Sequence, residues 1–107
     1  MSLTDSFLPC RQWHYNANDL FCEQVKLADL ARDFGTPLYV YSKEAITDAY
    51  KAYTKALANH PHLICYAVKA NSNIAILQLL ANLGCGFDIV SGGELKIGRA
   101  TSELQSP

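Results

Sequence analysis

The chain lacks the features that mark several common classes of protein. Its 107 residues carry a formal net charge of −1, and no block of one sign offers a face to nucleic acid or another polyanion. No apolar run approaches the roughly 18 residues that a membrane-spanning helix needs. The first residues show no basic stretch followed by an apolar one, so we expect no secretory signal. These absences favour a cytoplasmic protein that binds neither nucleic acid nor membrane.

Metal-binding and nucleotide-binding patterns are also missing. The four cysteines form no CxxC pair and have no histidines at the spacing of a zinc site. We therefore expect no metal site and reduced cysteines, with Cys65 and Cys85 as packing residues. No GxGxxG or Walker A pattern supports nucleotide binding.

Half of the residues are hydrophobic, which is enough for one small domain with a core. Apolar spacing predicts a helix that ends near Gly35, and Ser42 is placed to cap the next one. A third helix is expected after 71–73 and a fourth from 91 to about 101. Apolar runs predict strands at 38–41, 63–68 and 87–90. Residues 1–24 carry weaker signals, although 12–15 fits a short strand and 16–19 a turn.

Strand, helix, strand, helix, strand, helix is the βαβ order of a parallel sheet, and continuous apolar strands favour burial on both faces. A closed (β/α)8 barrel needs roughly 200 residues or more. We therefore predict an α/β fold that holds the first three or so β/α units of a partial TIM barrel. An amino-terminal segment, 1–24, precedes an incomplete barrel domain, 25–107. A complete open sheet is the competing interpretation, although three strands are few for one.

Lys69 is the strongest candidate for chemistry, because it directly follows the apolar run 63–68. Active-site groups of a barrel stand at the carboxyl ends of its strands. A lysine held there away from water is a usable amine nucleophile that forms Schiff bases. The plain alternative is a surface lysine in a strand–helix loop. Ser42 and Asp88 occupy comparable positions, and a buried Asp88 would find a cationic partner in Lys69.

The stretch 91–94, Ser-Gly-Gly-Glu, precedes the last predicted helix. Its glycines could cradle a phosphate with backbone N–H groups, or they could simply allow a tight turn, which is the commoner case. Glu94 is either a partner of the helix dipole or a carboxylate turned toward the site.

Three motifs, in order along the chain, resemble the diaminopimelate decarboxylase family. They are FGTPLYVY at 34–41, YAVKANSN at 66–73 and LGCGFDIVSGGEL at 83–95. The resemblance covers about 25–96 and implies a fold-type III enzyme that depends on pyridoxal 5'-phosphate (PLP), with a barrel followed by a β-domain. It implies a carbon–carbon lyase of lysine biosynthesis, which converts meso-2,6-diaminopimelate to L-lysine and CO2. It also implies an amino-acid substrate and a homodimer with a shared active site.

Position by position, the resemblance implies that Lys69 is the catalytic lysine that holds PLP. Asp88 matches the family's aspartate beside that lysine, as a cofactor-binding residue. Glu94 matches the glutamate after the glycine pair, behind the groups that touch the cofactor. Ornithine and arginine decarboxylases of the same fold share the lysine and the Phe-Asp pair. They tend to have other residues directly after the lysine, where this chain has Ala70-Asn71. They also tend to differ directly after the Phe-Asp pair, where this chain has Ile-Val-Ser at 89–91.

The family is roughly four times as long as this chain, since it adds the rest of the barrel and a β-domain. In addition, 102–107 differs from the family's continuation at that point. We therefore expect an amino-terminal part with little or no activity alone, without the phosphate-binding loop and the groups lent by a second subunit. The alternative interpretation is a non-catalytic barrel fragment or a PLP-binding module.

Overall fold

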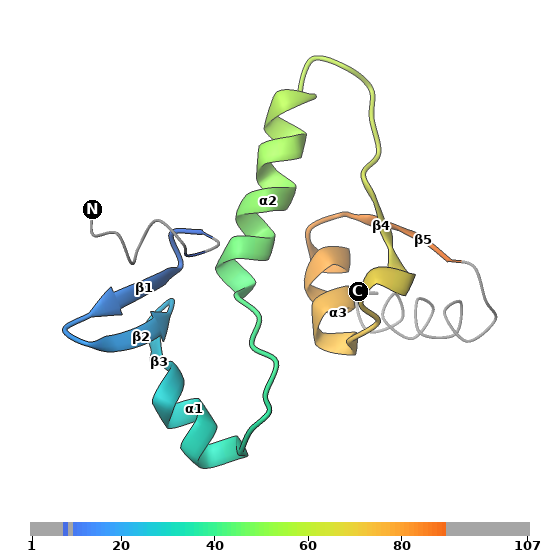
Figure 1. Ribbon diagram of the computed structural model, residues 1–107. Helices are drawn as coiled ribbons and strands as arrows, with labels where there is room; N and C mark the ends of the chain where they lie inside the picture. The colour runs from blue at the N-terminus through green and yellow to red at the C-terminus, as the bar shows by residue number, and fades with distance from the viewer. Residues whose placement is uncertain (1–7, 9, 90–107) are drawn as a thin grey trace. The chain divides into compact units, whose positions relative to one another are not determined.

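The computed structural model describes residue 8 and residues 10–89, which build a small α/β structure (Figure 1). The chain divides into two compact units, 1–46 and 47–107. The boundary falls inside helix α2 (Lys43–Ala56). Among the described residues, no helix has both the length and the apolar character needed to cross a membrane.

A three-stranded antiparallel sheet opens the first unit (Figure 1). Its strands are β1 (Trp13–Asn16), β2 (Asp19–Cys22) and β3 (Val25–Lys26), in the order β1-β2-β3. Two-residue loops join them, and the first loop residues, Ala17 and Glu23, have positive φ angles of 54° and 57°. Such angles suit the twist of a tight hairpin. The strand predicted near 12–15 and the turn after it are confirmed, whereas β2 and β3 are additional.

Helix α1 (Leu27–Phe34) follows β3 directly, as the apolar spacing predicts. It ends at Gly35, whose φ of 81° lies in the region that favours glycine. The Gly35 N–H donates to the carbonyl of Ala31 at 2.8 Å, which satisfies one of the last helical carbonyls. The predicted stop at this glycine is therefore confirmed.

Residues 38–41 form no strand, so the prediction made from their aromatic and β-branched side chains is wrong. No described strand pairs with this segment, and Tyr39 is 87% exposed. Strand propensity expresses packing against neighbouring strands more than a preference of the backbone itself. The parallel sheet of the described residues therefore has two strands instead of the predicted three.

Helix α2 begins directly after Ser42, which caps it as predicted. The Ser42 Oγ accepts a hydrogen bond from the Ala45 N–H at 3.0 Å, and Ser42 is buried. Its hydroxyl therefore has a structural role in the first unit. None of the residues of α2 is buried, and Tyr53 is 65% exposed.

The second unit contains one parallel βαβ unit, as predicted. Strand β4 (Cys65–Ala67) leads through the short 3-10 helix η2 (Val68–Ala70) to helix α3 (Ile74–Asn82) and strand β5 (Gly86–Asp88). Strands β4 and β5 pair in parallel. No residue of either strand is buried, so the expected burial on both faces is wrong for them. The buried apolar residues of this unit lie in η2, in α3 and just before β5. They are Val68, Ile76, Leu77, Leu80, Ala81 and Cys85.

The junction between α3 and β5 depends on small residues. A Cβ on Gly86 would lie 3.0 Å from the Cys65 Sγ, so a glycine allows β5 to approach β4. Cys85 is a buried packing residue, as predicted, and its thiol donates to the carbonyl of Ile64 at 3.3 Å. Burial raises the pKa of the Cys85 thiol, which therefore stays protonated at neutral pH. Cys65 is exposed, so the same prediction is wrong for it.

Candidate functional site

Lys69 occupies the turn that immediately follows β4. The turn is the 3-10 helix η2, a single turn of Val68, Lys69 and Ala70. The Val68 side chain is fully buried, whereas Lys69 is exposed. The buried neighbour therefore anchors the backbone, while Lys69 is exposed. The expectation of a lysine held away from water is wrong for the described residues, which instead show the plain alternative, a surface lysine in a strand–helix loop.

Two hydrogen bonds close this turn around Lys69. The Asn71 N–H donates to the carbonyl of Val68 at 3.2 Å. The Tyr66 hydroxyl, which comes from β4, donates to the carbonyl of Asn71 at 3.0 Å. Both backbone polar groups of Asn71 are therefore held, one by the turn itself and one by the strand.

A second set of hydrogen bonds joins the turn to helix α3. The Asn71 side-chain oxygen accepts from the Asn73 N–H at 3.0 Å. The Asn73 side-chain oxygen then accepts from the N–H groups of Ala75 at 2.9 Å and Ile76 at 3.4 Å, which makes it the helix N-cap. Asn71 and Asn73 thus fix where the loop ends and the helix begins.

Asp88 ends the neighbouring strand and lies opposite Ala67 in the parallel register. Because Lys69 follows Ala67 by two residues, both charged side chains belong to the same, carboxyl-terminal edge of the two-stranded sheet. Asp88 is exposed, so the expectation of a buried carboxylate is wrong. Within the described residues, no ion pair or hydrogen bond joins Lys69 to Asp88. Ser91, Gly92, Gly93 and Glu94 and the helix predicted after them lie outside the described residues.

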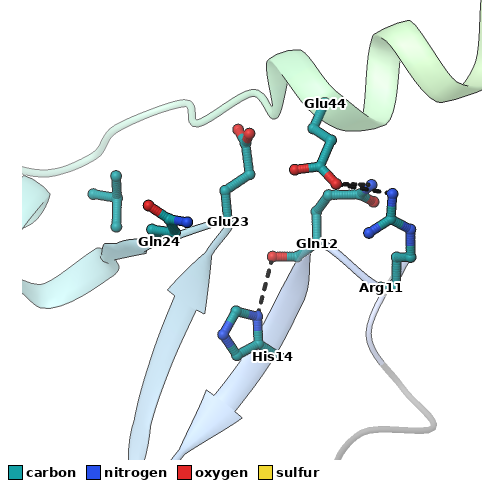
Figure 2. A pocket seen from close by; sticks show the side chains of 7 residues that line it. Arg11, Gln12, His14, Glu23, Gln24 and Glu44 are labelled. Carbon is teal, nitrogen blue, oxygen red and sulfur yellow. Dashed lines mark hydrogen bonds and ion pairs between the residues drawn. The ribbon is translucent and has the colours of Figure 1, made fainter.

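A separate polar pocket of about 510 Å³ lies in the first unit (Figure 2). Arg11 and Glu44 form an ion pair across 2.8 Å, and the Gln12 amide donates to the same carboxylate at 3.5 Å. A ring nitrogen of His14 lies 3.3 Å from the Gln12 carbonyl. The remaining lining residues are Glu23, Gln24 and Val25. Sequence reasoning missed this pocket because its residues come from three short segments that share no motif.

The family of the chain follows from a comparison with protein-family models. Residues 43–103 match the model described as "Pyridoxal-dependent decarboxylase, pyridoxal binding domain". This match covers more than half of the chain and includes both Lys69 and Asp88. The chain therefore belongs to the pyridoxal-dependent decarboxylase family.

Comparison with individual proteins identifies similar sequences and a similar solved structure. The chain is 60% identical over 77 residues to diaminopimelate decarboxylase of Vibrio cholerae, which covers 72% of this chain and 18% of the relative. It is 57% identical over 82 residues to that of Pseudomonas aeruginosa, covering 77% of this chain and 20% of the relative. A crystal structure of diaminopimelate decarboxylase from M. jannaschii in complex with L-lysine has a TM-score of 0.82 and 40% identity, covering 86% of this chain and 23% of that chain. The chain thus spans about a fifth of the length of these relatives.

Proposed function

We propose that this chain provides the PLP-binding lysine of a decarboxylase that converts meso-2,6-diaminopimelate to L-lysine and CO2. One observation carries the proposal. Lys69 stands directly after β4, at the sheet edge where Asp88 ends β5, in a chain that is 60% identical over 77 residues to a diaminopimelate decarboxylase.

The residues at this edge fit PLP. A primary amine condenses reversibly with an aldehyde, and a substrate amine can displace it. Lys69 supplies such an amine, and its exposure leaves it accessible to a cofactor. The Asp88 carboxylate at the same edge offers an acceptor for an ammonium group. When bound, PLP supplies an electron sink for the electron pair that decarboxylation leaves on the α-carbon.

Lys69 and Asp88 then have different roles. Lys69 would hold the cofactor covalently, and its Nζ, once displaced by the substrate amine, could carry a proton. In the reaction, the bond from the α-carbon to a carboxylate breaks, CO2 leaves, and a proton takes its place on the same carbon. Asp88 would accept a hydrogen bond from Nζ and so orient it.

We also propose the architecture that this function needs. Residues 25–107 would be the opening β/α units of a fold-type III TIM barrel, preceded by 1–24. The parallel pairing of β4 and β5 around α3 supports this, because it is one βαβ unit of the kind that barrels repeat. The resemblance alone supports a role for Glu94 behind the cofactor and a homodimer with a shared site. Four free thiols support a reducing, cytoplasmic location.

The proposal is tested by asking which lysine captures PLP. The chain is incubated with PLP, reduced with borohydride and digested, and the phosphopyridoxyl group is located by peptide mass mapping. We expect it on Lys69, with little on Lys51 and Lys55, which are exposed lysines of α2 and serve as internal controls.

The matched variant is Lys69→Arg, which keeps the positive charge but removes the primary amine. It should lose the label at position 69 together with the visible absorbance of the bound cofactor. Equal labelling of all exposed lysines in the unmodified sequence would contradict the proposal. Because the chain spans about a fifth of its relatives, we expect it to form no measurable L-lysine alone.

A further inference from the structure

Tyr66 has a hydroxyl whose partner the sequence motif does not reveal. We propose that Tyr66 is a positioning residue for Lys69, acting through the backbone of the turn and not through contact with the cofactor. The inference rests on the proposed function, because it concerns how the same lysine is presented.

The geometry around Lys69 carries this inference. The Tyr66 hydroxyl reaches five residues along the chain to the Asn71 carbonyl, at 3.0 Å. Lys69 lies inside the loop that this bond closes. The Asn71 N–H, bonded to the Val68 carbonyl at 3.2 Å, closes a smaller loop around the same lysine. The backbone on the carboxyl side of Lys69 is therefore held at one residue by two bonds.

The first of these bonds also ties the turn to the sheet. Tyr66 is paired with Phe87 in the parallel register, next to Asp88. The backbone of Tyr66 is thus fixed relative to β5. Through its hydroxyl, the same residue also holds the backbone carbonyl of Asn71 on the other side of the turn. A lysine side chain has four flexible carbons, so the place of its Cα decides which positions Nζ reaches most often. Holding the Cα at the sheet edge where Asp88 ends β5 favours the geometry that the proposed chemistry needs.

A purely structural role would predict a different pattern. If the hydroxyl only satisfied the Asn71 carbonyl, its loss would lower the stability of the whole chain and affect every lysine alike. A positioning role predicts that labelling changes at Lys69 alone, while labelling of the other lysines stays unchanged. The two roles can therefore be separated.

The experiment compares Tyr66→Phe with Tyr53→Phe. Tyr53 is 65% exposed on α2, and its hydroxyl makes no hydrogen bond within the described residues. For each chain, the PLP concentration that gives half-maximal borohydride-fixed label at Lys69 is measured, together with hydrogen exchange of the Asn71 amide without PLP. Loss of one neutral hydrogen bond should raise the half-maximal concentration about threefold to tenfold in Tyr66→Phe. The Asn71 amide should exchange faster, while label at Lys51 and Lys55 and the Tyr53→Phe chain stay unchanged.

A second substitution distinguishes loss of the hydrogen bond from misfolding of the variant. Replacing Tyr66 by p-aminophenylalanine restores an N–H donor at the same place on the ring, so it should return both the half-maximal concentration and the Asn71 exchange toward their original values. An unchanged half-maximal concentration in Tyr66→Phe, with Lys69 labelled normally, would overturn the positioning role and leave the proposed function intact. Failure of the original sequence to label at Lys69 would overturn the proposed function, and the positioning role with it.

Discussion

Among the described residues, several charged residues of the first unit have ion-pair partners, which Lys69 and Asp88 of the second unit lack. Arg11 pairs with Glu44 at 2.8 Å, Lys26 with Asp19 at 3.2 Å, and Arg32 with Asp29 at 3.1 Å. In the second unit, Lys69 and Asp88 share one edge of a parallel sheet. Neither forms an ion pair within the part of the chain that the structure describes. Charges that are already paired serve the fold, whereas an amine left at a strand end is available for a ligand.

The described helices differ in how deeply their residues are buried. Helix α1 of the first unit and helix α2, which crosses the boundary between the units, have no buried residues. Helix α3 of the second unit buries Ile76, Leu77, Leu80 and Ala81. Packing rather than helix propensity provides most of the stability of a short helix. The turn that contains Lys69 therefore leads into α3, the helix with the most buried residues among those described.

The largest expected effect tests this difference in packing. Leu77 is fully buried in α3, whereas Ile74 on the same helix is 54% exposed. Leu77→Ala should lower the free energy of unfolding by about 2–5 kcal/mol, because it removes buried surface and leaves a cavity. Ile74→Ala should cost about 1 kcal/mol or less. Both values come from urea unfolding, and equal losses in the two variants would contradict a core centred on Leu77.

An intermediate effect concerns pH and the buried thiol of the second unit. Burial raises the pKa of the Cys85 thiol, so the folded chain keeps this proton to a higher pH than the unfolded chain. Its stabilising contribution is complete below the unfolded value of about 8.5 and is lost as pH rises through the folded value. The contribution of Cys85 to the free energy of unfolding should therefore fall above pH 8.5, by no more than about 1.4 kcal/mol per pH unit.

Cysteine variants identify the thiol responsible for that slope. Cys85→Ala should reduce the slope, whereas Cys65→Ala, at an exposed thiol, is the control. Burial also raises the pKa of the Cys22 thiol in the first unit, so part of the slope should remain until Cys22 is replaced as well. A slope abolished by Cys65→Ala alone would be inconsistent with this assignment.

The smallest expected effect sharpens the contrast between paired and unpaired charges. The side chains of Arg11 and Glu44 are 69% and 43% exposed, so their ion pair is partly screened by water. A double-mutant cycle with Arg11→Ala and Glu44→Ala should give a coupling energy of about 0.2–1 kcal/mol that decreases at high salt. In the absence of PLP, the same cycle with Lys69→Ala and Asp88→Ala should give no measurable coupling, because no ion pair joins the two side chains within the described residues. A larger value for the second pair would reverse the comparison.

Local signals explain what could be predicted from the sequence. Gly35, Ser42 and the asparagine cluster at 71–73 mark helix ends correctly, because a helix end depends on a few neighbouring residues. The placement of Lys69 and Asp88 at one edge followed from the parallel order of β4 and β5. The helix ends depend only on local residue patterns. The shared edge follows from one rule, that the carboxyl ends of parallel strands meet at the same edge of a sheet.

Long-range pairing explains what could not be predicted. The segment 38–41 has strand-like residues, yet strand formation also needs a partner, which no residue pattern within the segment supplies. The pocket brings Arg11 and Gln12 to Glu44, more than 30 residues along the chain. The Tyr66–Asn71 bond depends on the shape of one turn, because a hydroxyl in a strand motif can take many partners.

The most direct test of the account compares Lys69 with a lysine that the fold already uses. Lys26 of β3 is paired with Asp19, and its side chain is 36% exposed. At limiting PLP followed by borohydride, we expect Lys69 to capture the phosphopyridoxyl group at least about tenfold more than Lys26, because the Lys26 amine is held in an ion pair with Asp19, whereas Lys69 forms none within the described residues. Equal labelling of the two lysines, or preferential labelling of Lys26, would contradict it.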